Sequence, residues 1–251
     1  MREGRYRVRR ATAPLPDALR AVDAVLADPR AEVLQAGARA TVVAWPADGR
    51  ALVLKRFRER ALEALVLGSG AMRVWRAAAR LRAAGFAVPE MIAVLERRRF
   101  GLPAWSCTVA ARVGGERLDA LWARSRGAAR RRVSDAFADY LRGLHAAGLY
   151  PQDLRAANVL VAPAAAPTFV LVDLDRVRAY RRLSWARRRK NVVQVLRSAG
   201  RGTSTGERWR FLRRYLGAPN RAELRRRADE ILAEARAKDA EYARRRGVGS
   251  R

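Results

Sequence analysis

The feature that most constrains this chain is a short polar loop between two apolar segments. Apolar residues recur at helical spacing over residues 133–145, and Gly148 ends that pattern. Asp153 and Asn158 follow, five positions apart, directly before the apolar run at residues 159–161. We therefore expect a helix, then a loop that carries a carboxylate and an amide, and then a strand.

Two further carboxylates follow the next apolar run. Residues 169–172 have the composition of a buried strand, and Asp173 and Asp175 come directly after it. A phosphoryl-transfer site needs one carboxylate that accepts or orients the proton of the attacking hydroxyl. It also needs an amide and a second carboxylate that hold a metal ion against the nucleotide phosphates. Asp153 fits the first role, and Asn158 and Asp173 fit the second.

At these residues the chain resembles the protein-kinase-like fold, whose catalytic and metal loops have the pattern D-L-x-x-x-N, strand, Asp. The continuation "LVDLDRVR" and "RRRKNVVQVLRS" resembles the bacterial lipopolysaccharide kinases, which phosphorylate Kdo or heptose of the inner core. The resemblance covers about residues 34–198. It implies an α+β, bilobal fold, with a small antiparallel β-sheet N-lobe that carries one main helix and a mostly helical C-lobe.

The expected domain organisation has three segments. They are a basic N-terminal extension at 1–30, the N-lobe at 31–113 and the C-lobe with its catalytic and metal loops at 114–251. Within the N-lobe, apolar alternation predicts strands at 32–34, 41–45, 51–57, 91–95 and 105–113, a turn at 46–49 and a helix at 72–81.

Lys55 closes the third of these strands, as the lysine of a V-A-I-K pattern does. It is the only lysine in the first 189 residues of a chain that otherwise uses arginine almost everywhere. A compact ammonium can pair with α- and β-phosphates. We therefore interpret Lys55 as catalytic and nucleotide-binding, the alternative being an ordinary surface lysine.

The resemblance implies further contacts with ATP. Gly37 lies in the connection that corresponds to the phosphate-covering loop, and the adenine is expected against the backbone at Ala111 and Val113. Arg155 stands where kinases often place a lysine and is expected to contact the transferring phosphate. ATP with Mg²⁺, or alternatively Mn²⁺, is the implied cofactor pair. Asp175 is either an extra metal ligand or the partner of a nearby arginine.

Two positions depart from the family pattern. Val74 stands where the family carries the glutamate that pairs with the lysine, and Glu59 and Glu63 are the candidates to replace it. Pro151 replaces the histidine that precedes the catalytic Asp by two positions. These departures keep open a non-catalytic pseudokinase that binds nucleotide or an anionic partner.

The net charge of +29, with 53 basic and only 24 acidic residues, indicates an anionic partner. A genomic preference for arginine and alanine accounts for the choice of arginine over lysine, but not for the shortage of acids. Nucleic acid, an anionic membrane face and a phosphorylated glycolipid all fit this charge. No nucleic-acid-reading motif is present, so the resemblance favours the lipopolysaccharide core as substrate, with peripheral contact to an anionic membrane face.

The remaining observations bear on location and on the alternatives. No apolar run approaches the roughly 20 residues that span a bilayer, and the single cysteine, Cys107, excludes an intramolecular disulfide. We expect a cytoplasmic protein, peripheral at the inner membrane, in which Cys107 and His145 are packed structural residues. An atypical serine/threonine protein kinase is an alternative, although no A-P-E-like segment follows Asp175.

Overall fold

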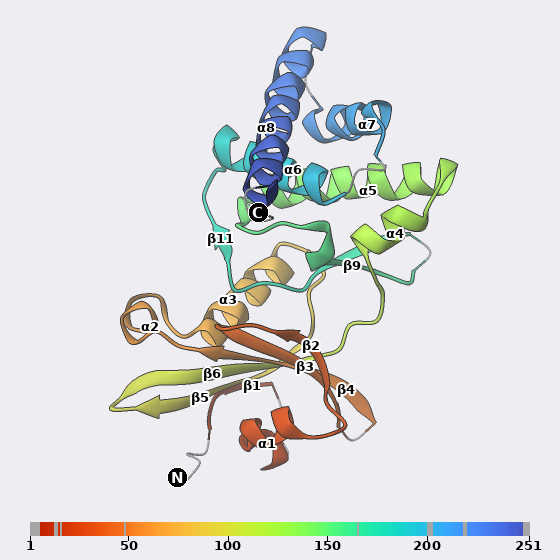
Figure 1. Cartoon of the computed structure of the whole chain (residues 1–251). Coiled ribbons are helices and arrows are strands. Elements are labelled where there is room, and N and C mark those ends of the chain that lie inside the picture. The colour runs from red at the N-terminus through yellow and green to blue at the C-terminus, as the bar shows by residue number, and fades with distance from the viewer. Residues whose placement is uncertain are drawn as a thin grey trace. The chain divides into compact units, whose positions relative to one another are not determined.

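The computed structural model describes residues 6–12, 15, 17–47, 49–164, 166–199, 203–217 and 220–247, which fall into two compact units (Figure 1). Unit 1 comprises Met1–Val113 together with Asp173–Arg176. Unit 2 comprises Gly114–Val172 and Val177–Arg251. The chain therefore leaves unit 1, builds part of unit 2, and returns to unit 1 for four residues at the predicted metal loop.

Unit 1 is built on one antiparallel sheet with the strand order β1-β5-β6-β4-β3-β2. The strands are β1 (Arg7–Ala11), β2 (Glu32–Ala36), β3 (Ala40–Ala47), β4 (Arg50–Arg58), β5 (Met91–Arg99) and β6 (Leu102–Ala111). Its helices are η1 (Asp17–Arg20), α1 (Val22–Ala27), α2 (Ala61–Leu67) and α3 (Gly70–Ala83). The predicted antiparallel sheet with one main helix is confirmed.

The two faces of this sheet carry different neighbours because side chains alternate along each strand. Leu52 and Leu54 of β4 join the buried cluster that also contains Val22 and Val25 of α1. Lys55 and Phe57 point to the other face, where Phe57 lies against Gly70 at the start of α3. The alternation of β4 therefore turns the lysine toward the main helix.

The predicted elements of unit 1 are present, with shifted ends. The helix predicted at 72–81 is α3, which Ser69 caps by accepting a hydrogen bond from the backbone N–H of Met72. Of the predicted turn at 46–49, residues 46 and 47 belong to β3, and Asp48 lies outside the described residues. The segment expected as an N-terminal extension contributes β1 and α1 to the sheet and its core.

Unit 2 is mostly helical, as predicted for the C-lobe, and contains two small antiparallel sheets in the orders β10-β9-β7 and β11-β8. Its helices are α4 (Leu118–Arg124), α5 (Gly127–Ala146), η2 (Ala156–Asn158), α6 (Trp185–Ser198), α7 (Thr205–Leu216) and α8 (Arg221–Gly247). Its strands are β7 (Glu116–Arg117), β8 (Leu149–Pro151), β9 (Val159–Ala162), β10 (Thr168–Leu171) and β11 (Val177–Ala179).

The amphipathic pattern at 133–145 becomes the inner face of α5. Phe137 is fully buried and packs against Phe169 of β10 and Phe211 of α7, with ring centroids 5.1 and 6.3 Å away. This aromatic cluster ties β10, which leads directly into Asp173, to two helices of unit 2. Among the described residues, no helix has the length and apolar character that crossing a bilayer requires.

Gly148 connects α5 to β8 and thereby starts the catalytic loop. Its φ of +74° lies in the left-handed region, and a Cβ at this position would overlap the carbonyl oxygen of Tyr180. The Tyr180 N–H donates to the Gly148 carbonyl at 2.9 Å. The sequence therefore needs glycine here for two reasons, the backbone conformation and the close approach of the segment that follows β11.

We predict that Gly148→Ala destabilises the protein more than Gly127→Ala does. Gly127 also has a positive φ but has open space around its Cα, so its substitution costs only the conformational penalty of about 1 kcal/mol. The overlap with Tyr180 adds roughly 1–3 kcal/mol for Gly148→Ala. Urea unfolding of both variants measures the difference, and equal losses would contradict the predicted close approach.

Candidate active site

Lys55 lies between two carboxylates within unit 1. Its ammonium Nζ is 2.5 Å from Asp173 Oδ1 and 3.3 Å from Asp175 Oδ1, and only 16% of its side chain is exposed. The strand β4 supplies the cation, and the returning segment Asp173–Arg176 supplies both anions. Because a partly buried charge requires a compensating partner, these contacts hold the returning segment against β4.

The two carboxylates have different affinities for a proton. Burial and a hydrogen bond with the Asp175 carboxyl raise the pKa of Asp173, against the opposing charge of Lys55. Burial also acts to raise the pKa of Asp175, but the hydrogen bond from Asp173 and the charge of Lys55 outweigh it and lower the pKa. This divergence is the usual behaviour of two carboxylates that share one site.

The lysine does not take its partner from the candidates expected in the sequence. Glu59 accepts hydrogen bonds from the Gly70 N–H at 2.7 Å and from the Ser106 hydroxyl, and Glu63 pairs with Arg73 at 3.4 Å. Val74 is buried in α3. Among the described residues, Asp173 and Asp175 are the carboxylates that pair with Lys55, so Asp175 pairs with a lysine and not with an arginine.

Asp153 and Asn158 lie in the loop between β8 and β9 of unit 2. The Arg155 Nε–H donates to Asp153 Oδ1 at 2.8 Å, which brings these two predicted catalytic residues together. The amide Nδ2 of Asn158 donates to the backbone carbonyl of Asp153 at 3.1 Å. The amide nitrogen of Asn158 is therefore engaged within the loop, and its amide oxygen is an acceptor of the kind that a metal ion can bind.

One face of α6 holds the backbone of this loop. Asn191, Gln194 and Ser198 follow each other at spacings of three and four, which places them on one side of the helix. Two of these side chains donate to loop carbonyls: Asn191 Nδ2 to Pro151 at 2.7 Å and Gln194 Nε2 to Gln152 at 2.9 Å. Two accept from loop N–H groups: Gln194 Oε1 from Leu154 at 3.3 Å and Ser198 Oγ from Ala156 at 2.9 Å.

Sequence reasoning missed this polar face. Its signal was present, since Asn191, Gln194 and Ser198 interrupt an otherwise apolar helical pattern at helical spacing. Asn191 is buried and Gln194 and Ser198 are half-buried, so these polar side chains require hydrogen-bond partners, and the loop backbone supplies them. The loop therefore obtains its rigidity from α6 as well as from the ring of Pro151.

His145, on α5, supports the same hydrogen bonds because it contacts Asn191. Its predicted structural role is confirmed. Its side chain is buried, with Nε2 3.0 Å from Asn191 Oδ1 and Nδ1 2.7 Å from the Tyr215 hydroxyl. Because an amide oxygen only accepts, Nε2 carries the proton and Nδ1 accepts from Tyr215. Burial lowers the pKa of His145 to about 4, with the charge of Arg188 acting in the same direction.

The residues expected around the nucleotide base and phosphates all belong to unit 1. The Gly37 N–H donates to the Ala40 carbonyl at 3.0 Å and closes the tight turn between β2 and β3. Ala111 ends β6, and its N–H donates to the Glu90 carbonyl at 2.9 Å. Val113 is the last residue before the chain enters unit 2.

The two predicted metal ligands are both oxygen donors. Among the described residues, no three His, Cys, Asp or Glu side chains form a cluster that could hold a metal ion. Mg²⁺ is typically bound by one or two carboxylates together with substrate phosphates and water. Asp173 lies in unit 1 and Asn158 in unit 2, and each by itself offers a hard oxygen donor of the type that Mg²⁺ prefers.

A family model and a solved structure that covers nearly the whole chain are similar to this protein. A family model described as "Lipopolysaccharide kinase (Kdo/WaaP) family" matches residues 52–215. The solved structure "WaaP in complex with acyl carrier protein" is 24% identical and superimposes with a TM-score of 0.69, covering 90% of this chain and 92% of that one. A structure of Rad53 with AMP-PNP, 19% identical, has a TM-score of 0.41 and covers 57% of this chain and 37% of that one. No curated protein sequence matches the chain significantly.

We predict that acidification destabilises the protein through His145. Between the ordinary pKa of 6.5 and the folded value of about 4, the unfolded chain binds a proton at this ring and the folded chain does not. Stability is therefore complete above pH 6.5 and falls as the pH drops toward 4, by roughly 3 kcal/mol in total. Urea unfolding across this range measures the slope, and His145→Asn is the control. A slope that His145→Asn leaves unchanged would exclude His145 as its source.

Proposed function

The chain belongs to the lipopolysaccharide kinase (Kdo/WaaP) family, and on that premise we propose an ATP-dependent phosphotransferase that phosphorylates a sugar hydroxyl, of Kdo or heptose, in the lipopolysaccharide inner core. The observation that carries the proposal is the position of Lys55, paired with the two carboxylates that follow β10. In kinases, a lysine on a strand and a carboxylate that follows two paired strands hold the nucleotide phosphates and their metal ion.

Asp153 is the proposed catalytic group toward the acceptor sugar. Its carboxylate would accept or orient the proton of the attacking hydroxyl, and its ion pair with Arg155 keeps one oxygen fixed. The guanidinium of Arg155 uses its Nε–H for Asp153, and its terminal nitrogens remain as donors for oxygens of the transferring phosphate. This arrangement supports acid–base and phosphate-binding roles for adjacent residues of one loop.

Lys55, Asp173 and Asn158 are proposed to handle the nucleotide phosphates. Lys55 would pair with the α- and β-phosphates, and Asp173 and the amide oxygen of Asn158 would hold the metal ion. Mg²⁺, when bound, supplies positive charge that neutralises the phosphate oxygens. The bond from Asn158 Nδ2 to the Asp153 carbonyl supports this role, because it orients the amide within the loop.

The adenine and the phosphate-covering turn are proposed in unit 1. Because the Ala111 N–H already donates to Glu90, adenine recognition at Ala111 would use the carbonyl, with the N–H of Val113 as the complementary donor. The turn at Gly37 would cover the phosphates. The excess of basic residues supports peripheral association with an anionic membrane face, where the acceptor glycolipid is located.

Two other functions stay as alternatives with distinct outcomes. A serine/threonine protein kinase would place phosphate on protein and not on glycolipid. A non-catalytic nucleotide-binding protein would bind ATP without transferring phosphate, and Val74 in place of the lysine-pairing glutamate is the observation that favours it.

We predict that label from [γ-³²P]ATP appears on isolated inner-core glycolipid and that Asp153→Asn lowers this rate by about 10²–10⁴-fold. ATP affinity should change little, because Asp153 is assigned to the acceptor hydroxyl. Asp229→Asn, at an exposed position of α8, is the matched control and should retain full activity.

The same assay, run in parallel with a general protein substrate, separates the alternatives. Label on protein alone would replace the sugar-kinase proposal with the protein-kinase one. ATP binding without label on either acceptor would favour the non-catalytic function. An active Asp153→Asn variant would remove Asp153 from the mechanism.

A further inference from the structure

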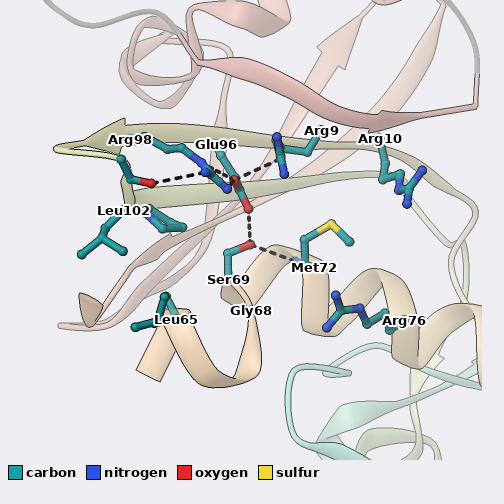
Figure 2. A pocket seen from close by; sticks show the side chains of 13 residues that line it. Arg9, Arg10, Leu65, Gly68, Ser69, Met72, Arg76, Glu96, Arg98 and Leu102 are labelled. Atoms are coloured by element: carbon teal, nitrogen blue, oxygen red, sulfur yellow. Dashed lines mark hydrogen bonds and ion pairs between the residues drawn. The ribbon is translucent and has the colours of Figure 1, made fainter. Parts of the chain in front are cut away.

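Unit 1 contains a cavity away from Lys55, between the helices α2 and α3 and the strands β1, β5 and β6 (Figure 2). Its volume is about 370 Å³. Leu65 and Leu102 lie toward one end of it, and Arg10 and Arg76 lie toward the other. The end with Leu65 and Leu102 also holds Arg98, which is paired with Glu96, and the opposite end carries Arg10 and Arg76.

The charge of this cavity is unbalanced. Glu96 is buried, accepts a hydrogen bond from Ser69 at 2.7 Å, and pairs with Arg98 at 3.1 Å and with Arg9 at 3.3 Å. Arg10 and Arg76 also line the cavity, which gives four arginines against one glutamate. Three positive charges are therefore in excess, and the site favours an anion near Arg10 and Arg76.

The helix α2, which borders this cavity, exposes its apolar side chains. Leu62, Leu65 and Val66 are 82%, 68% and 80% exposed, and Leu65 also lines the cavity. Four of the ten large apolar side chains that are exposed among the described residues belong to this helix. Phe100, 90% exposed, lies at the turn between β5 and β6, next to Gly101 at the cavity. Exposed apolar residues gathered in this way usually mark a binding surface.

We propose that α2 and the adjoining arginine-lined cavity form the surface by which this protein docks on an anionic phospholipid bilayer. Leu62, Leu65 and Val66 enter the boundary between headgroups and acyl chains, and Arg10 and Arg76 bind the phosphate of a lipid headgroup. The inference deepens the proposed function, since it rests on the acceptor being a membrane glycolipid, and it assigns membrane contact to particular residues.

Charge and chemistry together favour a bilayer over a protein partner. Protein interfaces concentrate aromatic side chains at their centre, whereas the exposed apolar side chains of α2 itself are all aliphatic and Phe100 lies outside this helix. Aliphatic side chains beside an excess of arginines match the acyl and phosphate layers of an anionic membrane. The nearest acid on α2, Glu63, is paired with Arg73 and so does not repel such a surface.

The first test measures sedimentation of the full chain with vesicles of phosphatidylcholine containing about 30% phosphatidylglycerol. The triple variant Leu62→Gln/Leu65→Gln/Val66→Gln should bind at least about tenfold more weakly, since even one lost side-chain burial is worth that factor. The control Val33→Gln/Leu34→Gln removes exposed apolar side chains from the edge strand β2 and should bind as wild type does.

The second test separates the cavity arginines from net charge. Arg10→Gln/Arg76→Gln should lose at least about tenfold in affinity for these vesicles, because each arginine near an anionic surface contributes several-fold. Arg131→Gln/Arg132→Gln removes the same charge from exposed positions of α5 and should lose far less. Equal losses in the two variants would show diffuse attraction and overturn the headgroup site.

A fluorescent label on α2 tests insertion directly. Cys107 is fully buried and its thiol pKa is raised to about 12, so it does not compete for a thiol reagent. Nitrobenzoxadiazole attached through Val66→Cys should shift to the blue on the anionic vesicles, and the same label at Val33→Cys should not. Equal spectra at the two positions would exclude insertion of α2.

These measurements need no phosphate transfer, so they are independent of the kinase assay. Failure of wild type to bind the anionic vesicles would overturn the docking proposal and leave the proposed activity intact. Self-association at micromolar concentration that the α2 triple variant abolishes, measured by analytical ultracentrifugation, would assign the surface to a second copy of the chain and equally overturn it. An inactive protein that still docks through α2 would instead refute the proposed function alone.

Discussion

The pairing of Lys55 with Asp173 and Asp175 holds the returning segment Asp173–Arg176 against β4, and the candidate active site of unit 1 depends on it. It joins residues 118 and 120 positions apart and fixes the point at which the chain returns from unit 2. Removing the lysine would leave two partly buried carboxylates side by side without a cation, which is costly. The proposed function assigns Lys55 of this cluster to the nucleotide phosphates and Asp173 to the metal ion, so stability and proposed chemistry would use one ion cluster.

Unit 2 positions its catalytic candidates by a different device. Neutral side chains of α6 bind the backbone of the loop at Asp153, and His145 supports Asn191 from α5. Backbone contacts of this kind fix where the loop runs while leaving the side chains of Asp153 and Arg155 partly exposed. Ion pairs thus position the proposed catalytic groups of unit 1, and hydrogen bonds from neutral side chains position those of unit 2.

Sequence reasoning succeeded where periodicity and chemistry coincide. The inner face of α5 and the strand before Asp173 were predictable because their apolar residues repeat at the period of the element that forms. It failed where tertiary contacts override the local pattern. The strand β1 is exposed and rich in arginine, and α2 exposes its aliphatic residues, so neither carries the usual signal. The partners of Lys55 lie too far along the chain for spacing to identify them.

The measurement that tests the central claim most directly is calorimetric titration of Mg²⁺–ATP into wild type, Lys55→Met and Lys190→Met. Lys190 is exposed on α6, so its substitution removes a lysine without touching the ion cluster. If the cluster at Lys55 holds the nucleotide phosphates, Lys55→Met weakens binding by about tenfold or more, as loss of a charged hydrogen bond does, and Lys190→Met binds as wild type. Unchanged affinity in Lys55→Met would show that the nucleotide phosphates are held elsewhere.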